Sequence, residues 1–125
     1  MNNCEKAIYG ESHVYQCLID AGIDVEWSAL SNRHSREDFI ANGAMVDVKF
    51  SKKHGRRYTF NCHHHAKKQE GIDFYICVIN PENVFVFPNE LIDGKVLTIS
   101  QKQVERGRYE YFNKNWGLIK NFVKK

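Results

Sequence analysis

The stretch DFIANGAMVDVKF, residues 38–50, decides the fold. Two short apolar runs lie on either side of Asn42-Gly43. Asn-Gly is the strongest short-range signal for a two-residue hairpin turn, because both turn positions of a type I′ turn need a positive φ. Such a turn fixes the register of the two strands, so that 41 faces 44, 40 faces 45, 39 faces 46 and 38 faces 47.

That register places Asp38 and Asp47 opposite each other on one face of the hairpin, with β-carbons ~5 Å apart. Lys49 follows on the same face, ~6.7 Å further along the strand. Asp47 and Lys49 alone would also be typical of an ordinary solvated sheet face. Facing carboxylates repel each other, however, and two of them beside a lysine are suited to a divalent cation.

An amphipathic helix is predicted over residues 4–21, because Val14, Leu18 and Ala21 fall on one stripe at helical spacing. Glu11 lies in the same stripe, where a carboxylate must form a pair, bind a metal or lie at the rim of the core. Gly22 is expected to end this helix, and a short strand is expected over 23–27.

The rest of the chain predicts a single α/β domain over residues 1–125. Loops are predicted at 28–37 and at 51–57, and the second of these loops is basic. The further expected elements are a strand at 58–61, a short helix at 62–71, strands at 73–80 and 83–88, a turn or helix at 89–93, a strand at 96–100 and a helix at 108–123 with Tyr109, Phe112, Trp116, Ile119 and Val123 on its inner face.

Glu11 on a helix, Asp38 at the start of a strand and Asp47-Val48-Lys49 on the next strand resemble the motif of the PD-(D/E)XK nuclease superfamily. The likeness covers roughly residues 5–80, and Glu37 stands where the motif usually has proline. The segments DFYICVINPENVFVFPNEL and YFNKNW are also similar to small members, among them intron-encoded homing endonucleases and junction resolvases. The resemblance implies a restriction-endonuclease-like αβββαβ core, with a mixed central sheet flanked by helices and a C-terminal helix.

The resemblance also implies a Mg²⁺ (or Mn²⁺) site whose catalytic residues are Glu11, Asp38, Asp47 and Lys49. Asp38, Asp47 and the backbone carbonyl of Val48 would bind the metal ion, and Glu11 would bind it directly, through water or at a second ion. Lys49 would orient or deprotonate the attacking water and neutralise the phosphate. Enzymes of this superfamily cut DNA so that a 5′-phosphate and a 3′-hydroxyl remain.

Positive charge is concentrated in two stretches, although the net charge is only +3. Residues 49–70 contain seven Lys or Arg against one acidic residue, and 101–125 contain seven against two. A basic surface beside an acidic cluster fits DNA binding, although solvated loops have a similar composition. The candidate DNA-binding residues are Lys52, Lys53, Arg56, Arg57, Arg33 and Arg36.

The function predicted from the sequence is a metal-dependent DNA endonuclease, with a site-specific cutter of the homing or restriction type favoured. The alternatives are a structure-specific enzyme resembling Holliday-junction resolvases, a non-catalytic DNA- or protein-binding module, and a zinc-binding regulator that uses Cys62 and the histidines at 63–65. Cutting both strands would require a homodimer or higher homo-oligomer, with 85–87 and the C-terminal helix as possible interfaces. The sequence shows neither a signal peptide nor a membrane-spanning run, so a cytoplasmic protein is expected.

Overall fold

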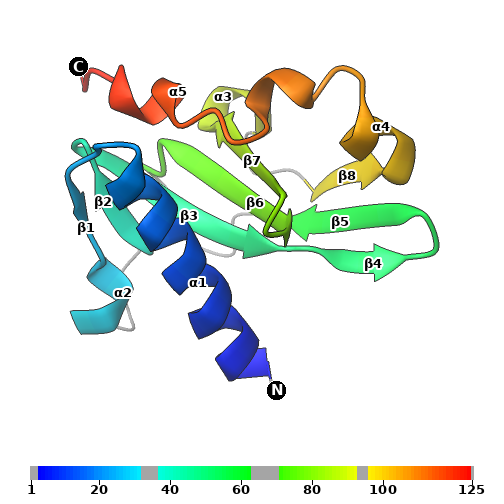
Figure 1. The fold of residues 1–125 in the computed structure, drawn as a ribbon, viewed down its shortest axis with the longest axis horizontal. Helices are drawn as coiled ribbons and strands as arrows, with labels where there is room; N and C mark the ends of the chain where they lie inside the picture. Colours follow the sequence, from blue (N-terminus) through cyan, green and yellow to red (C-terminus); the bar gives the residue numbers. More distant parts are fainter. Residues whose placement is uncertain (1–2, 32–36, 63–70, 93–95, 125) are drawn as a thin grey trace.

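The computed structural model describes residues 3–31, 37–62, 71–92 and 96–124, which form a mixed α/β structure with two sheets (Figure 1). In chain order its elements are α1 (Asn3–Asp20), β1 (Val25–Glu26), α2 (Ser28–Ser31), β2 (Phe39–Ala41), β3 (Ala44–Phe50), β4 (Lys52–His54), β5 (Arg57–Asn61), β6 (Phe74–Asn80), β7 (Asn83–Pro88), α3 (Asn89–Ile92), β8 (Val96–Ser100), α4 (Gln101–Glu105), the 3-10 helix η2 (Glu110–Phe112) and α5 (Gly117–Lys120). In these ranges no helix combines the length and the apolar character that crossing a membrane requires.

The larger sheet has the strand order β1-β2-β3-β6-β7. Strand β3 runs parallel to β6, and the other neighbours are antiparallel. This arrangement confirms the predicted mixed central sheet flanked by helices. The predicted hairpin register is confirmed as well: Ala41 pairs with Ala44 and Phe39 with Val46, around a turn in which Asn42 and Gly43 have φ of 50° and 77°.

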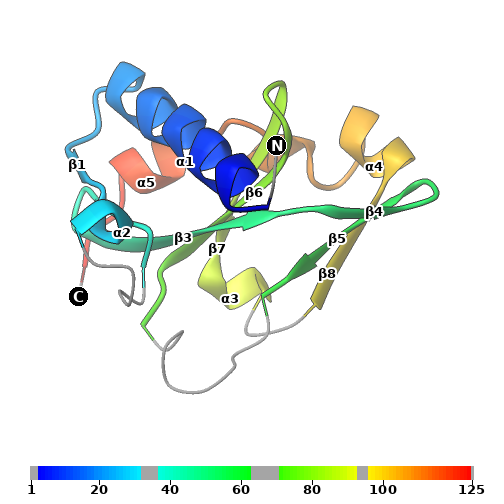
Figure 2. The ribbon, with the colours of Figure 1, turned by 90° about the horizontal axis from the view of Figure 1, so that it is seen from below.

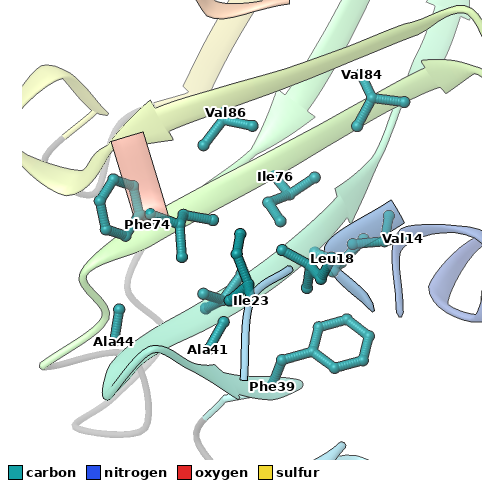
Figure 3. Close-up of a cluster of buried hydrophobic side chains, with 13 residues drawn as sticks. Val14, Leu18, Ile23, Phe39, Ala41, Ala44, Phe74, Ile76, Val84 and Val86 are labelled. Atoms are coloured by element: carbon teal, nitrogen blue, oxygen red, sulfur yellow. The ribbon is translucent and has the colours of Figure 1, made fainter. Parts of the chain in front are cut away.

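Hydrophobic side chains fill both faces of this sheet, because alternate residues of a strand point to opposite sides. On one face Val14 and Leu18 of α1 are fully buried against Ile76 and Val84 of the sheet (Figure 3). On the other face Tyr75, Phe85 and Phe87 pack with the smaller sheet and with η2. Figure 2 shows α1 and α3 on opposite sides of the sheet. The two clusters fix α1 and the smaller sheet relative to β3.

The predicted basic loop at 51–57 is wrong, because most of these residues form a second hairpin. Strands β4 and β5 pair antiparallel, His54 opposite Arg57, around a turn in which Gly55 has φ of 64°. Strand β8 pairs with β5 to complete a three-stranded sheet in the order β4-β5-β8. In Figures 1 and 2, β4 continues from the end of β3, so this smaller sheet extends away from the larger one.

The predicted helix at 108–123 is also wrong, since only η2 and α5 form there. The segment between them pairs with the edge of β7 instead: Lys114 donates its N–H to Val84 O at 2.7 Å, and Asn113 Oδ1 accepts the N–H of Val84 at 3.1 Å. These bonds satisfy the strand edge at the expense of helix continuity. Of the predicted inner face, Ile119 is buried, whereas Val123 is 80% exposed.

Three short segments were predicted with mixed success. Residues 28–31 form the short helix α2 where a loop was predicted, and the remainder of that loop, at 32–36, lies outside the described residues. The helix predicted at 62–71 lies almost entirely outside them as well. Helix α4 was not predicted, although Ser100 and Gln103 form a capping box, a pattern that is visible in sequence.

Residues 85–87, which were predicted as a possible oligomer interface, are covered by other parts of this chain. Phe85 and Phe87 are 0% and 1% exposed. The ring of Phe87 packs against those of Tyr109 and Phe112, with centroids 5.6 and 5.1 Å apart. The apolar side chains of β7 therefore belong to the interior of this chain, and the aromatic residues near the C-terminus cover them.

Candidate active site

The candidate site lies on the edge of β3, at the point where β2 begins. The ladder between these strands reaches Phe39 opposite Val46, and Asp38 N–H still bonds to Val46 O at 2.9 Å. Beyond that pair the next main-chain donor of β3 on this edge is Val48. Its N–H bonds to Oδ2 of Asp38 at 2.7 Å, so a carboxylate takes the place of a strand partner.

Asp38 and Asp47 lie just beyond the last paired residues of the hairpin, Phe39 and Val46, and their carboxyl groups are close enough for each to change the pKa of the other. Asp47 is 8% exposed, which is unusual for an acidic residue. The ammonium Nζ of Lys49 lies 3.0 Å from Oδ2 of Asp47, in an ion pair whose side chains are 20% and 12% exposed. This pair is therefore partly buried and is not a solvated surface bridge.

Glu11 completes the cluster from a different element. It lies on α1, is half-buried, and its carboxyl group is close enough to that of Asp38 for each to change the pKa of the other. The structure thus brings together the four predicted catalytic residues, Glu11, Asp38, Asp47 and Lys49, from a helix and two strands. Their roles in a reaction stay predictions.

The cluster opposes the ionisation of its own carboxyl groups. Burial raises the pKa of Asp38 to about 6, and the neighbouring Glu11 adds to that rise. Burial, and then the hydrogen bond and negative charge of Asp38, raise the pKa of Asp47 to about 7, although Lys49 acts in the opposite direction. Burial also raises the pKa of Glu11. Three acids beside one lysine leave negative charge that a bound cation would offset.

The oxygen atoms at this edge fit a hard divalent cation. Within a strand, the N–H and C=O of one residue point to the same edge, so the carbonyl of Val48 points to the side occupied by Asp38. Among the described residues, no three acidic, histidine or cysteine side chains already converge as a metal-binding group. Two carboxylates and one carbonyl, with water in the other positions, match Mg²⁺, which usually keeps several waters.

The candidate DNA-binding residues fall into two groups. Lys52, Lys53, Arg56 and Arg57 are exposed on the hairpin formed by β4 and β5, next along the chain from the cluster, whereas Arg33 and Arg36 lie outside the described residues. A hollow of about 620 Å³ beside the hairpin turn has Arg56, Lys102 and Arg106 in its lining, with Glu105 as the one acidic lining residue. Lys102 in α4 and Arg106 directly after it were not among the predicted DNA-binding residues, although the positive charge of 101–125 was a signal for them.

The predicted zinc ligand Cys62 is a buried thiol at the end of β5. Its hydrogen bond with Cys77 lowers the pKa of the Cys62 thiol, while burial raises the pKa of Cys77. The histidines at 63–65 lie outside the described residues. Cys62 therefore packs in the interior with Cys77, and the zinc-binding alternative gains no support from the described residues.

The fold and the cluster together define a mixed α/β protein with an acidic cluster and a lysine at the edge of its central sheet. No family model matches the chain, and no curated protein matches it. Among solved structures, the bacterial homing endonuclease I-Ssp6803I is similar, with a TM-score of 0.73 and 19% identity over 94% of this chain and 91% of that one. At this identity the likeness establishes a shared fold.

Proposed function

We propose that this chain is a Mg²⁺-dependent endonuclease that hydrolyses phosphodiester bonds in duplex DNA at specific sites. The observation that carries the proposal is the cluster at the edge of β3, where Asp38 accepts the N–H of Val48 and the neighbouring Asp47 pairs with the ammonium of Lys49. The shared fold with a bacterial homing endonuclease supports the same conclusion. The motif resemblance to PD-(D/E)XK nucleases agrees with both.

In this proposal Asp38, Asp47 and the Val48 carbonyl hold Mg²⁺, and Glu11 contributes through Asp38 or through water. When bound, Mg²⁺ supplies charge stabilisation at the phosphate and acidifies a coordinated water. The raised pKa values of Asp38 and Asp47 are consistent with this assignment, because two buried carboxylates without a cation favour protonation. The hydrogen bond from Val48 N–H holds the Asp38 side chain in place.

Lys49 has the role of positioning the nucleophile and stabilising the phosphate. Its ammonium lies 3.0 Å from Asp47, so it stays next to the proposed metal ligands and keeps N–H groups that can point to a water or a phosphoryl oxygen. The water oxygen bonds to phosphorus as the bond to the 3′ oxygen breaks. The water gives up a proton and the 3′ oxygen gains one, which leaves a 5′-phosphate and a 3′-hydroxyl.

Binding of the duplex would use the hairpin that follows the cluster. Lys52, Lys53, Arg56 and Arg57 are exposed there and can neutralise backbone phosphates. The described part of the chain holds one such cluster, so cutting both strands of a duplex at one site would use two copies. A homodimer or larger homo-oligomer is therefore part of the proposal.

The test is the nicking and linearisation of supercoiled plasmid by the purified protein with Mg²⁺ or with EDTA. Wild type should cut only with Mg²⁺, and Asp47→Asn and Lys49→Met should reduce cutting by about 10²-fold or more. Asp24→Asn and Lys120→Met are matched controls, because both residues are exposed and lie away from the cluster.

The two controls should cut like wild type. No cutting by folded wild type on plasmid carrying diverse sequence would overturn the catalytic proposal, and equal cutting by Asp47→Asn would place the site elsewhere. A four-way DNA junction run beside the plasmid distinguishes the subclasses, since preference for the junction regardless of sequence would replace the site-specific enzyme with a structure-specific one.

A further inference from the structure

The β4-β5-β8 sheet has two chemically different faces. Its inner face carries Tyr58, Phe60 and Ile99, which are at most 9% exposed and pack into the second hydrophobic cluster. Lys53 stands opposite Tyr58 in the ladder, and its ammonium lies over the Tyr58 ring, 5.6 Å from the centroid. Lys53 therefore belongs to the side of the sheet that faces the protein interior.

The outer face is mainly polar and basic, with the exposed Val96 opposite Asn61 at its far end. Pairing aligns its side chains in two rows across the three strands, because Lys52 faces Thr59 and Thr59 faces Thr98, while His54 faces Arg57 and Arg57 faces Ser100. Lys52, His54, Arg57 and Thr98 are exposed, and Thr59 and Ser100 are partly exposed. Strands β4, β5 and β8 contain no Asp or Glu. The face thus combines positive charge with hydroxyl, imidazole and guanidinium groups that can make directed hydrogen bonds.

We propose that this outer face is the surface through which the protein recognises base sequence in the major groove of duplex DNA. The inference rests on the proposed action on DNA and adds where specificity resides. The major groove is about 12 Å wide and admits a two-stranded β-ribbon, so the β4-β5 hairpin, whose strands are about 4.8 Å apart, fits within it with β8 at its side. The positive charge of the face complements the phosphates that border the groove.

The side chains of the face divide into base-recognising and supporting groups. Arg57 and Lys52 have the donors that bind O6 and N7 of guanine, while Thr59 and Thr98 offer a hydroxyl and a methyl group suited to adenine or thymine edges. Arg56, Lys102 and Arg106 line the hollow at the flank of the sheet, where they can contact phosphates without distinguishing bases. Because β4 continues from β3, the recognised base pairs lie close to the scissile phosphate.

Two pairs of adjacent residues provide matched variants for a test. Lys52 and Lys53 are identical neighbours on opposite faces of β4, and Arg56 and Arg57 are identical neighbours of which only Arg57 lies in the outer rows. Tagged wild type and each of the four single alanine variants would select bound duplexes from a randomised pool in EDTA. Sequencing then gives the base preference at every position, and thermal melting confirms that each variant is folded.

Wild type should enrich a defined sequence. Lys52→Ala and Arg57→Ala should each lower discrimination at one or two adjacent base pairs by about 5- to 150-fold. Arg56→Ala should weaken binding uniformly and reduce the salt dependence by about one phosphate, and Lys53→Ala should weaken binding no more than that, with the preferred sequence retained in both. This split separates base recognition from a general loss of charge.

The inference is overturned if the outer-face variants keep the wild-type preference, if the flanking variants change it to the same extent, or if no sequence is enriched by the wild type. The selection measures binding in EDTA and is independent of cutting. A protein that selects a sequence through Lys52 and Arg57 but leaves plasmid intact with Mg²⁺ would therefore overturn the nuclease proposal and retain the recognition face.

Discussion

Val48 donates its main-chain N–H to Oδ2 of Asp38 at 2.7 Å, on the edge of β3 that β2 leaves uncovered. One carboxylate thereby closes the end of a hairpin ladder and lies beside Asp47 in the acidic cluster. Asp38 consequently has a structural role that can be separated from its proposed role as a metal ligand.

Substitution of Asp38 should separate these two roles. Asp38→Asn keeps an oxygen that can accept the Val48 N–H, whereas Asp38→Ala leaves this N–H without its partner. We expect Asp38→Ala to be less stable than Asp38→Asn by about 1–3 kcal/mol in urea unfolding, the cost of an unpaired buried donor. Both variants should lose Mg²⁺-dependent cutting. Equal stability of the two would show that the hydrogen bond contributes little.

The stability of the metal-free protein should fall as pH rises through the range of the cluster. The folded-state pKa values of Asp38 and Asp47, about 6 and about 7, lie above the ordinary value of 3.8. A raised pKa means that the folded state binds more protons, so the contribution is fully present below pH 3.8 and is lost by about pH 7. Each pKa unit corresponds to about 1.4 kcal/mol, so the two raised pKa values together correspond to a loss of roughly 7 kcal/mol.

Urea unfolding in EDTA between pH 4 and pH 8 measures this effect. Asp47→Asn removes one titrating group and leaves the burial that raises the pKa of Asp38, so its stability should vary less with pH than that of wild type. Asp24→Asn is the control, because this exposed residue should leave the wild-type profile in place. Parallel profiles for wild type and Asp47→Asn would contradict the pKa values assigned to the cluster.

Mg²⁺ should stabilise the protein through the same carboxylates. At pH 8 both are largely ionised, and saturation to 100 times the dissociation constant adds about 2.7 kcal/mol to the folded state. We expect the melting temperature to rise with Mg²⁺ at pH 8, to rise less at pH 5, and to be unaffected in Asp47→Asn. A rise that is equal at both pH values and persists in this variant would indicate binding elsewhere.

The centre of the fold and the cluster were predictable because local chemistry determines them. Asn42-Gly43 permits a tight turn, that turn sets the register as far as Phe39 and Val46, and the residues that follow this pair are Asp38 and Asp47. Glu11 was placed by helical periodicity, and the structure confirms that it reaches Asp38. Each of these inferences spans only a few residues or a single periodic pattern.

The parts that were mispredicted depend on contacts between distant segments. Apolar periodicity at 108–123 favoured one helix, but the main chain at Lys114 bonds to Val84 on the edge of β7 and breaks it. The second hairpin was missed because its strands are short and polar, and β5 is completed by β8, which begins 35 residues after the end of β5. Strand pairing at such a separation leaves little signal in local sequence.

Asn42 should stabilise the C-terminal segment as well as its own turn. Its side-chain Nδ2 donates to the carbonyls of Ile119, Lys120 and Phe122 at 2.9, 3.0 and 3.1 Å. Asn42→Gly keeps the positive φ of the turn and removes these donors, so we expect a loss of about 1–3 kcal/mol in urea unfolding. Asn42→Asp should cost more, because a carboxylate would face three carbonyl oxygens. Wild-type stability in both variants would show that the three bonds do not hold α5.

Gly10 and Phe50 should be energetically coupled, because the Phe50 ring at the end of β3 lies directly against Gly10 of α1. A β-carbon at residue 10 would clash with Cε1 of the Phe50 ring, so the ring has to move in Gly10→Ala. The ring is 36% exposed and has room to shift, so we expect a modest loss of about 1–2 kcal/mol. In a Phe50→Ala background the same change should instead add about 0.5–1 kcal/mol, the helix propensity of alanine over glycine.

A double-mutant cycle from urea unfolding measures this change of sign. Gly10 precedes Glu11 directly, so a displaced helix should also lower the activity of Gly10→Ala, and activity should recover when Phe50→Ala is added. The exposed helical position Ser12 provides the control, since Ser12→Ala changes helix propensity without a ring to displace. If Gly10→Ala is stabilising with Phe50 present, the ring does not set the distance between α1 and β3, and the position of Glu11 must depend on the buried contacts of Val14 and Leu18 alone.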